Sequence, residues 1–176
     1  MQEVNKKAKY AVRNLRRVNH IIPMKSRLLL YNSLVASHLN YADTVWAGCN
    51  KQDQNKLQRT QNLAVKSILG MRKHESATGA LKKANLLPLD EKRKIHEAVF
   101  IHKGLSKKLP TSICRHYEQH KSLKNNRSAE QQILTIPIHK TERYKHCPLY
   151  RTIKTWNSIP QNIKESTRCF IISISC

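Results

Sequence analysis

The strongest pattern of apolar and polar positions in this chain runs from Ser26 to Gly70. Its first half holds the densest apolar run of the chain, with polar residues interleaved at helical spacing. After a short polar stretch, its second half carries an apolar stripe opposite a basic one. Apolar residues that recur every three to four positions form one face of an amphipathic helix. The pattern therefore predicts two helices joined by a turn, an αα-hairpin over residues 26–70.

Local signals predict where these two helices end. Gly48 is expected to close the first helix, and Asp53 and Gly70 to be the N-cap and C-cap of the second. The expected inner face of the first helix is Leu28, Tyr31, Leu34, Val35, Leu39, Ala42, Val45 and Trp46. The expected inner face of the second is Leu57, Gln61, Ala64, Val65 and Ile68. Stripes of this width are typical of helices that pack against a core.

The remaining patterns predict a mainly α fold, a helical bundle organised on the hairpin. A basic amphipathic helix is expected from Glu3 to Asn19, and further helices over 76–87, from Asp90 to Gly104, and after Pro110. These elements are assigned to one bundle over residues 1–117. A polar connector is predicted over 118–132, because its sequence, EQHKSLKNNRSAEQQ, has little to bury.

Residues 133–176 are predicted to form a small C-terminal appendage. The segment 133–141 is rich in β-branched residues but contains a proline, which favours an extended, edge-like strand. One or two helical turns are expected over 150–158, ended by Pro160. The tail FIISISC has strand propensity without an evident partner.

The charge of the chain indicates its binding partners and not its fold. Lysine and arginine total 33 against 11 acidic residues, which gives a formal net charge of +22. Such an excess attracts polyanions, and nucleic acid is the first candidate. The basic residues expected to contact phosphates lie opposite the apolar stripes or just past a helix end: Lys6, Lys9, Arg13, Arg16, Arg17, Lys56, Arg59, Lys66, Arg72 and Lys73. Tyr10, beside Lys9, is the best candidate for stacking on a base.

The competing polyanion is an anionic membrane surface. No run approaches the ~20 apolar residues of a spanning helix, and the N-terminus lacks the apolar core of a secretory signal. Five scattered cysteines without a CxxC pair suit a reducing compartment. We therefore expect an intracellular protein, in the nucleus or the cytoplasm, without membrane partners.

Two sequence patterns are similar to a catalytic motif and to a zinc site, but neither has the full set of residues that such a site requires. The run Tyr41-Ala42-Asp43-Thr44 is similar to the Tyr-x-Asp-Asp motif of polymerase active sites, but Thr44 replaces the second carboxylate that two metal ions require. Asp43 is therefore interpreted as a helix-terminal polar residue. The histidines and cysteines between Cys114 and Cys147 lack the paired spacing of zinc ligands. We expect no catalytic residue, no metal and no cofactor.

Three stretches in order carry a family resemblance: LYNSLVASHLNYADTVWAGCNKQDQNKLQRTQNLAVKSILG, ANLLPLDEKR and TWNSIP. Together they resemble the C-terminal region of non-LTR (LINE, jockey-like) retrotransposon reverse transcriptases, over roughly residues 7–160. The matching landmarks are Arg27, Tyr31, Tyr41, Trp46, Leu57, Gln58, Gln61, Ala64, Leu87-Pro88-Leu89, Trp156-Asn157 and Pro160.

The resemblance implies a thumb-like helical region that lies downstream of the polymerase palm and grips RNA, DNA or a hybrid through its backbone. It implies a truncated RNA-directed DNA polymerase that is no enzyme on its own. Two alternatives stay open at this point. One is a helical interaction module whose former interface with the palm is exposed and promotes self-association. The other is a non-functional reading frame left by a dead element.

Overall fold

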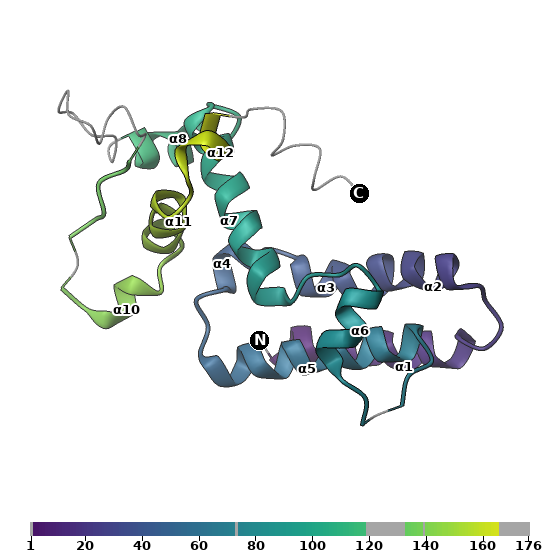
Figure 1. Cartoon of the computed structure of the whole chain (residues 1–176). Helices are drawn as coiled ribbons and strands as arrows, with labels where there is room; N and C mark the ends of the chain where they lie inside the picture. The colour runs from purple at the N-terminus through teal and green to yellow at the C-terminus, as the bar shows by residue number, and fades with distance from the viewer. Residues whose placement is uncertain (1, 73, 119–132, 139, 166–176) are drawn as a thin grey trace. The chain divides into compact units, whose positions relative to one another are not determined.

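The computed structural model describes residues 2–72, 74–118, 133–138 and 140–165 (Figure 1). These residues form helices and no strand, which confirms the mainly α fold class. They divide into two compact units. Unit 1 comprises Met1–Asp43 and Cys49–Arg93, and unit 2 comprises Thr44–Gly48 and Lys94–Cys176. The predicted boundaries at residues 118 and 133 do not coincide with this division.

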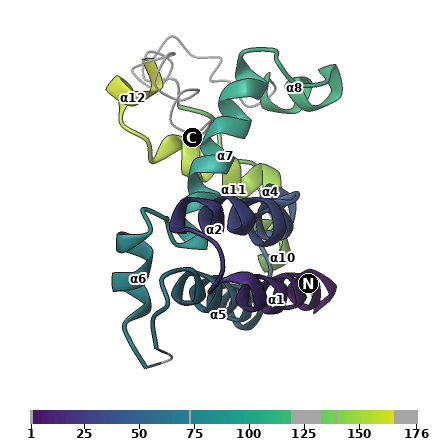
Figure 2. The same cartoon turned by 90° about the vertical axis from the view of Figure 1, so that its right-hand side faces the viewer.

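Unit 1 is a helical bundle that begins with α1 (Gln2–Val18). It packs on α5 (Lys51–Ile68) and on a continuous helical rod formed by α2 (Met24–Leu30), η1 (Tyr31–Ala36) and α3 (Ser37–Asn40), and α5 also packs on this rod. The short α6 (Ala77–Lys83) packs on α5 (Figures 1 and 2). The fully buried side chains at this junction include Val12, Leu15, Val35, Leu39, Leu57, Val65 and Ile68. The predicted hairpin is therefore part of a bundle that α1 completes.

The first helix of the hairpin ends earlier than predicted. It stops at Asn40, and Ala42 has a left-handed backbone (φ 48°) that cannot continue a right-handed helix. The short α4 (Asp43–Trp46) begins after this break. Within the rod, η1 is a π-helix, in which the Ser37 N–H bonds the Asn32 carbonyl. As a result Leu34 and Val45, expected on the inner face, are 40% and 64% exposed.

The ends of α5 correct both predicted caps, since the C-cap is Leu69 and Gly70 is the residue after it. Asn50, and not Asp53, is the N-cap, because its side-chain oxygen accepts the Asp53 N–H at 2.8 Å. Gly70 follows the last helical turn with φ 65°, and the Met71 N–H bonds the Lys66 carbonyl at 2.9 Å. This is a Schellman ending, in which glycine supplies the left-handed residue.

Glutamines of α5 hold the turn before α7 (Leu89–Leu105), which begins one residue ahead of the predicted cap, Asp90. The Gln61 amide donates to the Leu87 carbonyl at 3.0 Å, and Gln58 accepts the Leu89 N–H at 2.9 Å. Gln61 also donates to the Tyr31 hydroxyl at 3.3 Å. The bonds to Leu87 and Leu89 satisfy backbone groups in the turn that precedes α7.

Unit 2 has its own core, in which Ile101, Tyr117, Leu134, Ile153 and Trp156 are buried together. They come from α7, from α8 (Thr111–Glu118), from residue 134 and from α11 (Pro148–Asn157). The shorter α10 (Glu142–Lys145) and α12 (Gln161–Glu165) flank α11 in sequence. The predicted appendage thus shares a core with α7 and α8.

The segment expected as an extended strand is bonded to α11 by a side chain. In the described residues 133–138, Leu134 donates its N–H to the Asn157 side-chain oxygen at 2.9 Å, and its carbonyl accepts from the Asn157 amide at 2.8 Å. The Asn157 amide thus bonds both backbone groups of Leu134, the one residue of this described segment that forms a β-bridge. The predicted connector, from residue 119 onward, and the tail FIISISC lie outside the described residues.

Candidate nucleic-acid interface

Two helices that lie far apart in sequence bring their basic residues to one face of unit 1. Lys6, Lys9 and Arg16 lie three and seven positions apart on α1, and all three are exposed. Asn5 of α1 bonds Thr60 of α5 at 2.7 Å, and Asn19, just past α1, bonds the Ser67 carbonyl. The two contacts run in the same order along both helices, so α1 and α5 are parallel.

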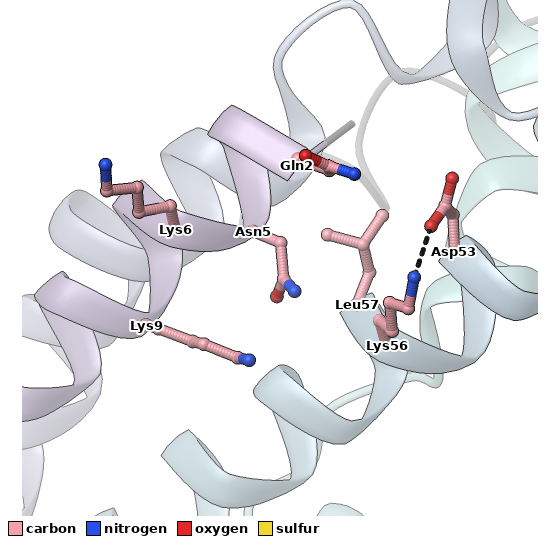
Figure 3. Close-up of a pocket in the computed structure, with 7 residues that line it drawn as sticks. All are labelled: Gln2, Asn5, Lys6, Lys9, Asp53, Lys56 and Leu57. Atoms are coloured by element: carbon pink, nitrogen blue, oxygen red, sulfur yellow. Dashed lines mark hydrogen bonds and ion pairs between the residues drawn. The ribbon is translucent and has the colours of Figure 1, made fainter.

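The first half of this face is a hollow of about 240 Å³ near the start of both helices (Figure 3). It is lined by Gln2, Asn5, Lys6, Lys9, Asp53, Lys56 and Leu57. Figure 3 shows the Lys9 ammonium extending toward α5, whereas the Lys6 ammonium points away from the hollow. Lys9 is therefore the cation that lies best for an anion bound between the two helices.

Asp53 reduces the availability of the Lys56 ammonium for a bound anion. The Lys56 ammonium lies 3.0 Å from an Asp53 carboxylate oxygen, and both side chains reach solvent. An anion at Lys56 must therefore compete with a carboxylate that is already in place, although an exposed pair of this kind is weak.

The second half is a hollow of about 270 Å³ near the ends of both helices. Arg16 of α1 faces Arg59, Asn62, Leu63 and Lys66 of α5 across it, with Met71 and Ala77 at the edge. We call the six cations of the two hollows, Lys6, Lys9, Arg16, Lys56, Arg59 and Lys66, the α1–α5 basic face. Along each helix it extends ten residues, or about 15 Å at 1.5 Å per residue.

Four of the predicted phosphate contacts are not part of this face. Arg13 and Arg17 are exposed on α1 but line neither hollow. Arg72 lies in the turn after α5, where its N–H donates to Glu75 at 2.6 Å. Lys73 lies outside the described residues.

The structure adds polar residues that sequence reasoning missed. The amides of Gln2, Asn5 and Asn62 lie among the cations of the basic face. A third hollow, of about 440 Å³, opens between α1 and the rod, where Tyr10 lies near Leu34 and His38 of the rod. The spacing of Asn5 and Lys9 on one helix face was a usable signal for the first group. No local sequence pattern predicts the third hollow, because it depends on how α1 packs against the rod.

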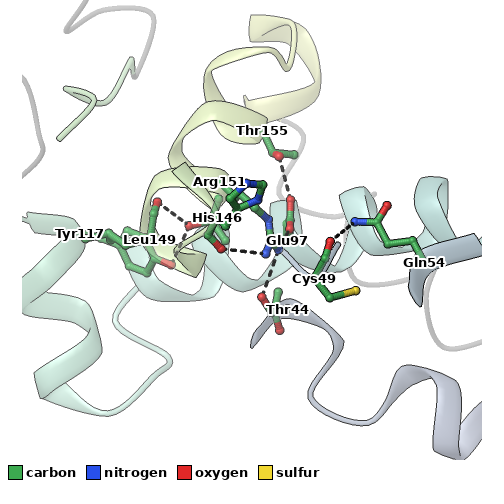
Figure 4. A network of polar contacts seen from close by, with 10 residues as sticks. Thr44, Cys49, Gln54, Glu97, Tyr117, His146, Leu149, Arg151 and Thr155 are labelled. Atoms are coloured by element: carbon green, nitrogen blue, oxygen red, sulfur yellow. Dashed lines mark hydrogen bonds and ion pairs between the residues drawn. The ribbon is translucent and has the colours of Figure 1, made fainter. Parts of the chain in front are cut away.

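A second polar network lies in unit 2, around a largely buried ion pair (Figure 4). Glu97 pairs with Arg151, and its second oxygen accepts from Thr155 at 2.9 Å. Arg151 also donates to the Thr44 carbonyl at 3.2 Å and to the His146 carbonyl at 3.4 Å. Because both partners of the ion pair have further hydrogen bonds, the network has the features of a structural clamp.

Tyr117 lies at the edge of this network. Its hydroxyl bonds Thr152 at 3.0 Å, and burial raises the pKa of the phenol above 10.0. Gly104 of α7 leaves room for the Tyr117 ring, because a Cβ there would lie 2.7 Å from a ring carbon. The phenol is therefore a packed, protonated group at neutral pH.

The residues considered for chemistry are dispersed. Asp43 is buried at the start of α4. Among the described residues, no three histidine, cysteine, aspartate or glutamate side chains come close enough to hold a metal ion. His120 and His139, which belonged to the cysteine and histidine pattern, lie outside those residues.

The described helices include none that is long and apolar enough to cross a membrane. In comparisons with known proteins, no family model, no curated protein and no solved structure matches this chain.

Proposed function

We propose that this chain binds the phosphate backbone of RNA, DNA or an RNA–DNA hybrid through the α1–α5 basic face, without reading sequence. The observation that carries the proposal is that two parallel helices, some fifty residues apart in the chain, place six cations around two hollows along their length. Support also comes from the net charge of +22. Lysine and arginine contacts to phosphates position a protein on nucleic acid but carry no sequence information.

We further propose that the chain derives from the C-terminal, thumb-like region of a non-LTR retrotransposon reverse transcriptase and lacks polymerase activity of its own. Support comes from the residues of the resemblance. Tyr31, Gln58, Gln61 and the Leu87-Pro88-Leu89 turn form one hydrogen-bonded group, as expected of landmarks that preserve a fold. A polymerase assay on the purified chain should be negative. A palm sequence upstream in the genome, interrupted by a stop or frameshift, would support this origin.

The binding proposal is tested by the salt dependence of affinity for a mixed-sequence duplex. If six cations meet phosphates, log K should fall with log salt with a slope near −5, from ~0.9 per contact. The triple variant Lys9→Glu, Arg16→Glu, Arg59→Glu removes three contacts, and its slope should be shallower by about 3.

A matched control makes the same change in charge elsewhere. Lys103, Arg115 and Lys154 are exposed residues of unit 2, and reversing all three alters the net charge equally. The control should keep a slope within about 1 of the wild type. Equal losses in both triple variants would show that only net charge matters, and a salt-independent affinity would overturn the proposal.

A second candidate function is a protein–protein interaction module. It is favoured by apolar side chains that unit 1 leaves in solvent, since Ile21 is 73% and Leu29 71% exposed. Exposed apolar surface promotes association. Sedimentation without nucleic acid tests this function, because a protein that stays monomeric over a hundredfold range of concentration does not use the surface to self-associate.

A further inference from the structure

The hollow between α1 and the rod, lined by residues of α1, η1 and α3, has a different chemistry from the α1–α5 basic face. Tyr10 is 64% exposed and lines it, together with the partly exposed Leu34 of η1. Two cations of α1, Lys6 and Lys7, and one carboxylate, Glu3, lie at the same hollow, and all three are exposed, so the charge there is net positive. An aromatic ring and an apolar side chain beside two ammonium groups match the two halves of a nucleotide, the base and the phosphate.

Polar groups at this hollow add hydrogen-bonding capacity. The Asn14 amide and the His38 imidazole also line it, and each can both donate and accept a hydrogen bond. A volume of about 440 Å³ lies in the range of small-molecule sites. The hollow therefore offers stacking, edge contacts and charge within one space.

We propose that this hollow binds an unpaired nucleobase stacked on Tyr10, so that the chain engages single-stranded nucleic acid beside the backbone held by the α1–α5 basic face. This inference rests on the proposed function. Lys6 lines both this hollow and the first hollow of the basic face, and thus connects them. In a duplex, the bases are stacked on one another, and their faces cannot reach a tyrosine ring without unstacking. Stacking on an aromatic side chain accepts any base, which fits an interface that reads no sequence.

The test compares three labelled probes of equal length: a single strand, its duplex, and a strand with abasic positions. Tyr10→Ala should weaken binding of the single strand by roughly 5- to 150-fold, the range for loss of one stacked base, and duplex binding by less than about twofold. Tyr10→Trp should retain single-strand affinity. Wild-type protein should bind the abasic strand about as weakly as Tyr10→Ala binds the intact one. Tyr41→Ala, which removes another exposed tyrosine of unit 1, should leave all three affinities unchanged.

The outcomes separate this inference from the proposed function. Salt-dependent duplex binding together with an unaffected single strand in Tyr10→Ala would overturn the stacking site and leave backbone binding standing. An equal loss for all three probes would assign Tyr10 to the backbone contact and also overturn the stacking site. No binding of any probe at low salt would overturn both proposals. Because Tyr10 is mostly exposed, the variant should fold, which far-ultraviolet circular dichroism checks.

Discussion

Asp53 illustrates how a single residue can serve the fold and oppose the candidate interface. It occupies the first turn of α5, where its backbone N–H completes the Asn50 cap and its negative charge favours the helix N-terminus. The same carboxylate pairs with Lys56 at the edge of the first hollow. The cost to binding and the benefit to the helix therefore come from one side chain.

Asp53→Asn should tighten nucleic-acid binding. The change frees Lys56 and removes a negative charge from the basic face, and exposed pairs of this kind are worth about 0.4–1 kcal/mol, or roughly two- to fivefold in affinity. Duplex titrations at fixed salt measure the gain. Thermal unfolding should show a small loss of stability, from the weaker interaction with the helix dipole. Unchanged affinity would mean that phosphates do not approach Lys56.

Tyr117 provides a residue-scale prediction in unit 2. Replacing it with Phe removes the hydrogen bond to Thr152 and should cost about 1 kcal/mol at neutral pH. Burial raises the pKa of this phenol in the folded state above 10.0. Its stabilising contribution is therefore complete below pH 10 and is lost as pH rises through the folded-state pKa.

The stability difference between wild type and Tyr117→Phe should accordingly shrink above pH 10. Urea unfolding at pH 8, 10 and 11 measures it. The lysines whose pKa is lowered by burial, such as Lys164, titrate in both proteins, so their effect cancels in the difference. A difference that is constant or grows with pH would contradict a buried phenol.

At the scale of elements, three helices end in the same way with three different residues. After α5, α6 and α7 the left-handed position is taken by Gly70, Asn85 and Lys107, with φ of 65°, 52° and 56°. Each ending has the same long bond, such as Lys108 N–H to the Lys103 carbonyl at 2.9 Å. Only glycine adopts this conformation without steric cost, so the motif after α7 carries strain that the one after α5 avoids.

Lys107→Gly should therefore stabilise unit 2. Removing the side chain from the left-handed conformation should raise the free energy of unfolding by about 1–2 kcal/mol. The greater conformational freedom of glycine in the unfolded chain should lower it by about 0.4–1 kcal/mol. The Lys107–Glu118 pair that is lost is long, at 3.7 Å, and exposed, so it contributes little. Chemical unfolding measures the gain, and Gly70→Ala in unit 1 should show a loss of about 1 kcal/mol as the converse. A destabilised Lys107→Gly would mean that the ion pair outweighs the strain.

The elements also show how far local pattern predicts this structure. Helices α1 and α5 follow from periodicity, and the end of α5 follows from Gly70, because glycine has a specific backbone role there. The break at Ala42 leaves no local signal, since alanine is the best helix former. Asn50 and Asp53 are both good caps, so composition alone does not choose between them. For the site, the basic stripe of each helix is readable from spacing, whereas the parallel packing that joins the stripes depends on tertiary contacts such as Asn5 to Thr60.

At the scale of the whole molecule, both partners of the Glu97–Arg151 pair belong to unit 2. The Glu97 side chain is 7% exposed and that of Arg151 is 16% exposed. Removing one partner therefore leaves the other as an unpaired, largely buried charge. A chain that divides into two compact units need not unfold in one step, and the stability of each unit is measured separately.

Arg151→Met should destabilise unit 2 by about 3 kcal/mol, because Glu97 would keep only its Thr155 bond. Amide hydrogen exchange in α11 measures the loss, and the amides of α1 and α5, in unit 1, are the internal reference. The double variant Glu97→Leu, Arg151→Met should recover most of the protection, since no unpaired charge remains. Unaltered exchange in α11 of the single variant would show that the pair does not stabilise the unit.

The division into two units also determines which unit contributes the intrinsic tryptophan fluorescence of the protein. Both tryptophans of the chain, Trp46 and Trp156, belong to unit 2, whereas unit 1, with the candidate interface, has tyrosines alone. Intrinsic tryptophan emission is therefore a reporter of unit 2 in the unmodified protein. If nucleic acid binds on α1 and α5 and the tryptophan emission changes, binding to unit 1 has altered the surroundings of a tryptophan in unit 2. The measurement needs no added label.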